Sequence, residues 1–128
     1  MSESAVVEVR NYITEEVEEE LYAGSVTIPA DTTTPYKVEE GRIPEGHEGV
    51  AVSVACTRDS NIAFWLKIDN KQRFKNGLNA GGLGGLDEET LLLVHIPEGK
   101  RWEIGFTNTS SSDITVGYRF RMRLFRKG

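Results

Sequence analysis

Cysteine and histidine are scarce in this sequence, and their scarcity excludes several kinds of site. The 128 residues include one cysteine, Cys56, and two histidines, His47 and His95. A single cysteine forms neither an intrachain disulfide nor a cysteine-based zinc site. Glu48 follows His47, but Ala51 stands where a zinc-protease helix carries its second histidine. We therefore expect no metal, no cofactor and no catalytic residues, and we expect Cys56 to be a buried, unreactive thiol.

Long apolar runs are also missing, and the charge is unevenly distributed. No apolar run approaches the roughly 18 residues of a membrane-spanning helix, so no membrane partner is expected. Residues 1–22 contain one base, Arg10, and these acids: Glu3, Glu8, Glu15, Glu16, Glu18, Glu19 and Glu20. Subtracting these from totals of 20 acids and 15 bases leaves 13 acids and 14 bases in the remainder. A near-neutral body disfavours binding of nucleic acid, which needs a dominant positive field.

The acidic segment predicts an N-terminal arm over residues 1–22, followed by one domain over residues 23–128. Ile13, Val17 and Leu21 are spaced at i, i+4 and i+8, which fits one face of a short helix. Such a helix is marginal alone and needs a surface to pack on. The arm is either a solvated terminus or a segment that docks on a basic surface of a partner or neighbouring subunit.

From Gly24 onward, apolar residues alternate with polar ones, which predicts half-buried β-strands. The last alternation is the clearest, because one parity is apolar and the other is rich in arginine. Its apolar set is Ile114, Val116, Tyr118, Phe120, Met122 and Leu124. The run from Leu91 to Ile96 is continuously apolar, which favours a strand buried on both faces over a short helix capped by the preceding acids.

Polar turns separate these predicted strands, and one turn motif is repeated. An Ile-Pro-Glu-Gly tetrapeptide begins at Ile43 and again at Ile96. Proline suits the second position of a turn, and glycine suits the fourth or a left-handed bulge. Many short strands with turns at this spacing predict an all-β fold, an antiparallel β-sandwich that is jelly-roll-like.

A glycine-rich segment from Gly77 to Leu86 could suggest a phosphate-binding loop, but the acids that follow it would repel phosphate. A close-packed or mobile loop between strands fits the composition, and so does a contact loop. In a contact loop, Leu78, Leu83 and Leu86 would be apolar anchors in a neighbouring chain.

Arg119, Arg121 and Arg123 share one face of the last predicted strand and form a basic stripe. Arginine on one strand face suits carboxylate or phosphate. We favour a protein partner, such as the acidic arm, over nucleic acid, and a solvated outer face is the remaining interpretation. Trp65 is the one tryptophan that parity places away from the core, which leaves a weak platform for stacking sugars.

The segment from Ser25 to Pro35 reads SVTIPADTTTP. It resembles the opening of small β-sandwich virion proteins of tailed phages and related archaeal viruses. Those proteins close with a strand like Trp102–Asn108 and a last hairpin strand like Ile114–Phe125. The resemblance covers about residues 23–126 and leaves out the acidic arm and the glycine-rich loop. It implies a non-enzymatic particle component, such as a head-decoration, turret or minor capsid protein, which is commonly homo-oligomeric.

We therefore expect a structural virion protein that binds and stabilises or decorates a viral capsid. Its expected partners are a major capsid protein or other virion subunits and further copies of itself, with a trimer favoured. Its expected location is the virion, and the host cytoplasm before assembly. The alternative is a carbohydrate-binding β-sandwich module used in adhesion or recognition.

Overall fold

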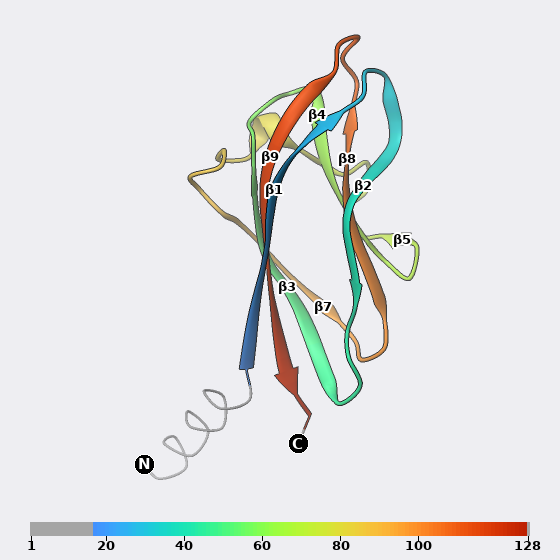
Figure 1. Cartoon of the computed structure of the whole chain (residues 1–128), viewed down its shortest axis with the longest axis vertical. Helices are drawn as coiled ribbons and strands as arrows, with labels where there is room; N and C mark the ends of the chain where they lie inside the picture. Colours follow the sequence, from blue (N-terminus) through green and yellow to red (C-terminus); the bar gives the residue numbers. More distant parts are fainter. Residues whose placement is uncertain (1–16, 128) are drawn as a thin grey trace.

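The computed structural model describes residues 17–127, which fold into two antiparallel β-sheets packed face to face (Figure 1). The strands of this range are β1 (Val17–Ile28), β2 (Thr32–Arg42), β3 (His47–Cys56), β4 (Ile62–Ile68), β5 (Lys71–Gln72), β6 (Leu78–Asn79), β7 (Thr90–Ile96), β8 (Arg101–Asn108) and β9 (Ile114–Arg126). A short 3-10 helix, Ala80–Gly82, follows β6. The expected all-β sandwich is confirmed.

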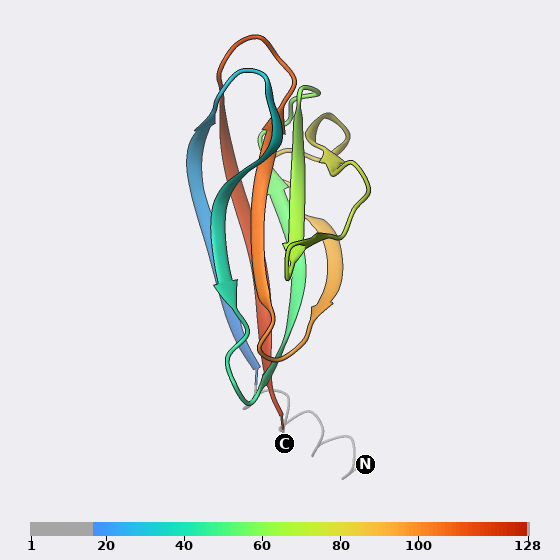
Figure 2. The same cartoon turned by 90° about the vertical axis from the view of Figure 1, so that its right-hand side faces the viewer.

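The order of the strands is that of a jelly roll. One sheet has the order β1-β9-β3-β7, and the other has the order β2-β8-β4-β5, with β6 also paired to β4. Successive strands alternate between the sheets except within the segment from β4 to β6. Figure 2 shows β2 and β8 side by side in the second sheet. In a jelly roll the chain passes repeatedly from one sheet to the other, so that the apolar faces of both sheets pack on a shared core.

Strand β9 lies at the centre of the first sheet and is 13 residues long. It pairs with β1 along one side and with β3 along the other. Its burial alternates as the sequence predicts, with Val116, Tyr118, Phe120, Met122 and Leu124 buried and the arginines directed outward. Alternation of this kind places one face on the core and the other toward solvent.

Aromatic side chains from both sheets meet in the core. The rings of Phe64 and Phe106 lie 5.8 Å apart on β4 and β8, and Phe120 of β9 lies 6.2 Å from Phe64. Trp102 of β8 is 5.4 Å from Phe120 and 5.0 Å from Tyr22 of β1, in an edge-to-face arrangement with Tyr22. Aromatic pairs in this range stabilise a core beyond their area of burial. They hold the two sheets together on the side where β1 faces β8.

The two Ile-Pro-Glu-Gly copies form equivalent turns at the same end of the sandwich. In each copy the residue after glycine donates its N–H to the proline carbonyl, at 3.2 and 3.1 Å. Proline is therefore the first residue of the turn rather than the second, and glycine is the third. Gly46 and Gly99 have φ values of +83° and +78°, which a type II turn requires at this position. Ile43 and Ile96 anchor the turns in the core.

Asn108 joins the loops at the opposite end of the sandwich. Its side chain is fully buried, and its amide nitrogen donates to the carbonyls of Ile28, Pro29 and Ser112 at 3.1, 3.3 and 2.9 Å. Its amide oxygen accepts a hydrogen bond from the Ser110 N–H at 2.8 Å. One side chain therefore satisfies the buried polar groups where β1 leads into β2 and β8 leads into β9.

The helical interpretation of the acidic arm is wrong for the residues that the structure describes. Val17 and Leu21 lie in β1, opposite Phe125 and Arg121 of β9. The third residue of the expected helical face, Ile13, lies outside the described range. A spacing of four residues keeps side chains on one face of a strand as well as of a helix, and pairing with β9 selects the strand.

The interpretation of Leu91–Ile96 as a strand buried on both faces is also wrong. β7 is the edge strand next to β3, and the side chains of Leu91 and Leu93 are 68% and 64% exposed. The register between β7 and β3 slips by one residue beside Val52, and Leu93 has a φ of +53°. Burial nevertheless alternates strictly along β7: Leu92, Val94 and Ile96 face the core, so the strand buries one face rather than two.

Replacing Asn108 by alanine is expected to lower the free energy of unfolding by about 3 kcal/mol, because buried carbonyls and an N–H lose their partner. Urea unfolding at neutral pH measures the effect. The matched control is Asn61→Ala, since the exposed Asn61 side chain makes only a 3.3 Å contact with Thr109 Oγ1. Equal stability of the two variants would contradict the role given to Asn108.

Candidate functional site

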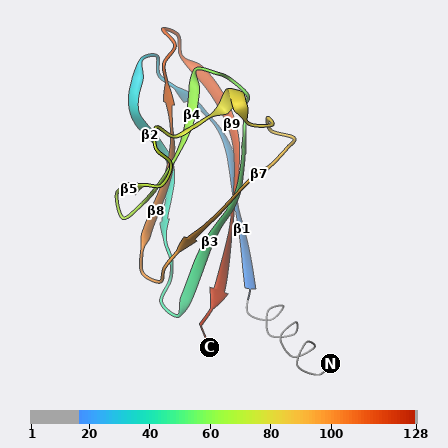
Figure 3. The same cartoon turned by 180° about the vertical axis from the view of Figure 1, so that it is seen from behind.

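The strand register brings part of the predicted partner-binding set to the outer side of the β1-β9-β3-β7 sheet, here called the outer β9 face. Arg119, Arg121 and Arg123 lie along its middle on β9. Leu21 lies opposite Arg121 on β1, and Leu91 lies opposite Ser53, which is itself opposite Arg121. The face therefore has a charged centre with exposed leucines toward both edges. Figure 3, which views the molecule from behind, shows β7 crossing next to β3 at the edge of this sheet.

The arginine stripe is paired with carboxylates of the same chain. Arg121 Nη1 lies 2.9 Å from Glu19 Oε1, and Arg121 Nε lies 3.1 Å from Glu89 Oε1. Glu19 also holds Arg123, with 2.8 Å between Oε2 and Nε. Arg119 is 4.0 Å from Glu89, whose carboxylate also accepts a hydrogen bond from the Ser53 hydroxyl. Glu19 bridges β1 to β9, and Glu89 ties the start of β7 to the same strand.

These contacts shift the titration of the acids. Hydrogen bonds from Arg123 and then Arg121 lower the pKa of Glu19. Hydrogen bonds from Arg121 and then Ser53 lower the pKa of Glu89. The carboxylates stay ionised at neutral pH and occupy the stripe, so the arginines are engaged with acidic side chains rather than left open for phosphate.

The leucines of the glycine-rich loop lie mainly against their own chain. Leu78 belongs to β6, which pairs with β4, and both Leu78 and Leu83 pack on the core. Leu86 is partly exposed and lies so close to Gly117 that a Cβ at this glycine would be 3.0 Å from its Cδ1. Its carbonyl accepts a hydrogen bond from Arg119 at 3.1 Å. Of the three, Leu86 is the residue that this arrangement leaves for a partner.

Sequence reasoning missed the exposed leucines of β7. Leu91 and Leu93 belong to the run that the pattern assigned to the interior, and they are the most exposed large apolar residues of the described range. They are exposed because β7 is an edge strand with only one face on the core, and no local pattern contains the position of a strand in its sheet. Two signals were available: His95, which lies within the run on the same parity as Leu91 and Leu93, and the Asp87-Glu88-Glu89 run before it, whose charges make burial costly.

The chemically reactive side chains form salt bridges or lie buried. His95 Nε2 is 2.5 Å from Glu48 Oε1, and His47 Nε2 is 3.7 Å from Glu18 Oε1. No group of three or more potential metal ligands occurs within residues 17–127. Burial raises the pKa of the Cys56 thiol to about 11, which keeps it protonated and poorly nucleophilic. In the same range, no helix is long and apolar enough to cross a membrane.

Trp65 offers little open ring face for stacking a sugar. It is half-buried, and its Nε1–H donates to Thr107 Oγ1 at 3.1 Å. Gly77 lies directly against the indole, since a Cβ there would be 2.8 Å from Trp65 Cε2. Trp102 is buried, as its parity predicts.

Comparison with known proteins identifies the architecture rather than a family. No protein-family model matches the sequence, and no curated protein matches it. A chain in the structure of infectious bursal disease virus Gx strain superimposes with a TM-score of 0.56 at 9% identity, covering 88% of this chain and 32% of that chain. The infectious bursal disease virus VP2 subviral particle gives 0.54 at 9% identity, covering 88% and 33%. This chain therefore spans about a third of the length of these structures.

A carbohydrate-binding domain, CBM36-1 of a multidomain xylanase from the hindgut metagenome of Trinervitermes trinervoides, has a lower TM-score of 0.40 at 11% identity. It covers 87% of this chain and 99% of that domain. At these identities the likeness to the viral structures establishes a shared all-β sandwich fold, and function has to be argued from the surface.

Lowering the pH is expected to weaken the fold through Glu19 and Glu89. Because their pKa values are lowered by folding, the stability from these pairs is present above the usual value of about 4.3 and is lost as the pH falls through the folded pKa. Urea midpoints at about pH 6 and about pH 3 should therefore differ less in the Glu19→Gln, Glu89→Gln double variant than in the parent. The control is Glu45→Gln, and an unchanged pH response in the double variant would contradict the assignment.

Proposed function

We propose that this protein is a structural component of a virus particle, where it binds the shell and stabilises or decorates it. The single observation that carries the proposal is the β7 edge, where Leu91 and Leu93 are exposed beside the paired charges of the outer β9 face. Large apolar side chains exposed together at a sheet edge are typical of a surface that another protein covers. The jelly-roll order of the strands and the likeness to the two viral structures support this role.

The proposed contact is with a neighbouring subunit, either a second copy of this chain or a major capsid protein. A homo-oligomer, with a trimer favoured, would place the leucine edge of one subunit against the next. Val17 and Leu21 belong to β1 rather than to a free arm, and they would offer a second contact, because Leu21 is 52% exposed at the opposite edge of the same sheet. The resemblance of Ser25–Pro35 to virion proteins of tailed phages and archaeal viruses supports a location in the virion after assembly from the host cytoplasm.

The observations favour this role over a carbohydrate-binding module that uses an aromatic platform. Such a platform needs an open ring face, whereas Trp65 is half-buried beneath Gly77 and Trp102 is buried between the sheets. Apolar edges and paired surface charges suit a protein partner instead.

Substitution of both exposed leucines is expected to reduce binding to particles while leaving the fold intact. Leu93→Asn suits a positive φ and so relieves backbone strain, and Leu91→Ser removes the other apolar side chain. The measurement is peptide mass spectrometry on density-purified particles from the culture that produces this chain. The parent should be present at a fixed ratio to the major shell protein, and the Leu91→Ser, Leu93→Asn variant should fall by about tenfold or more.

The matched control is Tyr36→Ser, which removes a 42% exposed aromatic side chain from β2 in the other sheet. Its ratio to the shell protein should equal that of the parent. Parent protein found only in the soluble cell fraction would reject the particle role. Retention of the double-leucine variant at the parental ratio would reject the β7 edge as the contact.

A further inference from the structure

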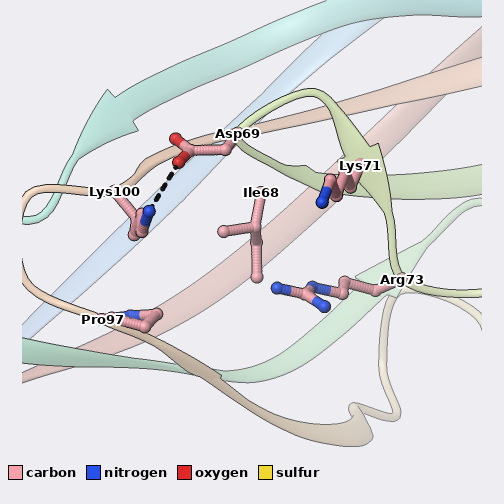
Figure 4. A pocket seen from close by; sticks show the side chains of 6 residues that line it. All are labelled: Ile68, Asp69, Lys71, Arg73, Pro97 and Lys100. Atoms are coloured by element: carbon pink, nitrogen blue, oxygen red, sulfur yellow. Dashed lines mark ion pairs between the residues drawn. The ribbon is translucent and has the colours of Figure 1, made fainter.

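A hollow with a basic lining lies between the β4–β5 hairpin and the turn from β7 to β8, away from the outer β9 face. It has a volume of about 380 Å³ and is lined by Ile68, Asp69, Lys71, Arg73, Pro97 and Lys100. Figure 4 shows the Lys71 and Arg73 side chains directed toward the space around Ile68, with Lys100 and Asp69 on the other side. We call this hollow the β4–β5 pocket. Its volume falls in the range of small-molecule sites.

The charges in the β4–β5 pocket do not cancel. Asp69 is its one acid, and its Oδ2 lies 3.1 Å from Lys100 Nζ. Its Oδ1 also accepts a hydrogen bond from the Arg101 N–H at 3.0 Å. In the described part of the chain, neither the Lys71 ammonium nor the Arg73 guanidinium has an ion pair. The pocket thus presents two unpartnered cations beside a carboxylate that is already neutralised.

The backbone holds these cations in place. Asp69 and Asn70 have φ values of +52° and +67°, which is the two-residue type I′ turn that suits a tight hairpin. Lys71 is paired with Ile68 across this turn, and the Arg73 N–H donates to the Leu66 carbonyl at 2.9 Å. Both basic residues are therefore held to β4 by backbone pairing, so their Cα positions are set before any ligand arrives.

We propose that the β4–β5 pocket binds a sugar that carries a sulfate or phosphate ester. An ester of this kind supplies the negative charge that Lys71 and Arg73 lack, and the planar guanidinium of Arg73 can form paired hydrogen bonds with two of its oxygens. One ester group fills only part of the hollow, which leaves room for the ring that carries it. Half-buried Pro97 offers an apolar surface for the C–H face of that ring, while Ile68, at 2% exposed, adds little accessible area.

A compact ligand fits the surroundings better than a long polyanion. The chain has a net charge of −5, and the arginine stripe of β9 is occupied by Glu19 and Glu89. The neighbouring hollow is lined by Glu40, Arg42 and Arg101, and its Glu40 pairs with Arg101 and Lys37. Nucleic acid needs a dominant positive field, and the net charge of this chain is negative.

The test is an NMR titration of the full chain at constant ionic strength with glucose 6-sulfate, glucose 6-phosphate, glucose and inorganic sulfate. Either ester should give saturable shifts of the amide signals of Lys71, Arg73 and Lys100. Inorganic sulfate should shift the same signals more weakly, and glucose should leave them unmoved. In the Lys71→Gln, Arg73→Gln variant, the Kd for the esters should rise by about tenfold, since charge-assisted hydrogen bonds are lost.

The matched control is Lys75→Gln, an exposed lysine two positions along the same loop that does not line the pocket. Its Kd should stay within about twofold of the parental value. The proposal is overturned if neither ester binds, if glucose shifts the same signals, or if Lys75→Gln weakens binding as much as the double variant. Because every lining cation is at the surface, the amide spectrum of each variant serves as the check that it is folded. Binding of the esters does not depend on whether the protein assembles on a particle.

Discussion

The register of β9 is the constraint on which the rest of the structure depends. This strand pairs along its length with β1 and along most of it with β3, so its alternation decides what both neighbours face. A slip of one residue would exchange the buried set from Val116 to Leu124 with the arginines and bury their charges. The arginines of β9 form ion pairs with Glu19 and Glu89. These pairs connect β1 and the segment before β7 to β9.

That pairing also decides which cations remain available to other molecules. The stripe from Arg119 to Arg123 is the most obvious basic feature of the sequence, yet its charge is met by acids of the same chain. Lys71 and Arg73 form no obvious pattern in the sequence, yet neither has an ion pair in the described range, and the fold places both at one pocket. Charge density along a sequence is therefore a poor guide to binding when the fold brings distant acids to it.

The sequence predicted the elements whose pattern is local and missed those that depend on pairing. The alternation of β9 and the burial of Trp102 follow from a period of two and were correct. The spacing of Val17 and Leu21 fits both a helix and a strand, and contact with β9 decides between them. The exposure of Leu91 and Leu93 depends on the place of β7 at the sheet edge, and the β4–β5 pocket joins Lys71 to Lys100 through the fold alone.

The two edge strands of the β9 sheet, β1 and β7, carry different side chains, and the difference bears on function. Along β1, Glu18, Glu19 and Glu20 stand beside Leu21, and charges on an edge strand discourage unwanted pairing. Along β7, a register slip interrupts the backbone ladder with β3, and Leu91 and Leu93 project outward, so a partner would meet leucine side chains. Holding a leucine at positive φ costs about 1 kcal/mol, and nothing within residues 17–127 covers Leu93 to offset it. The contact proposed with a neighbouring subunit would supply that compensation, which makes the β7 edge, rather than the arginine stripe, the stronger candidate for assembly.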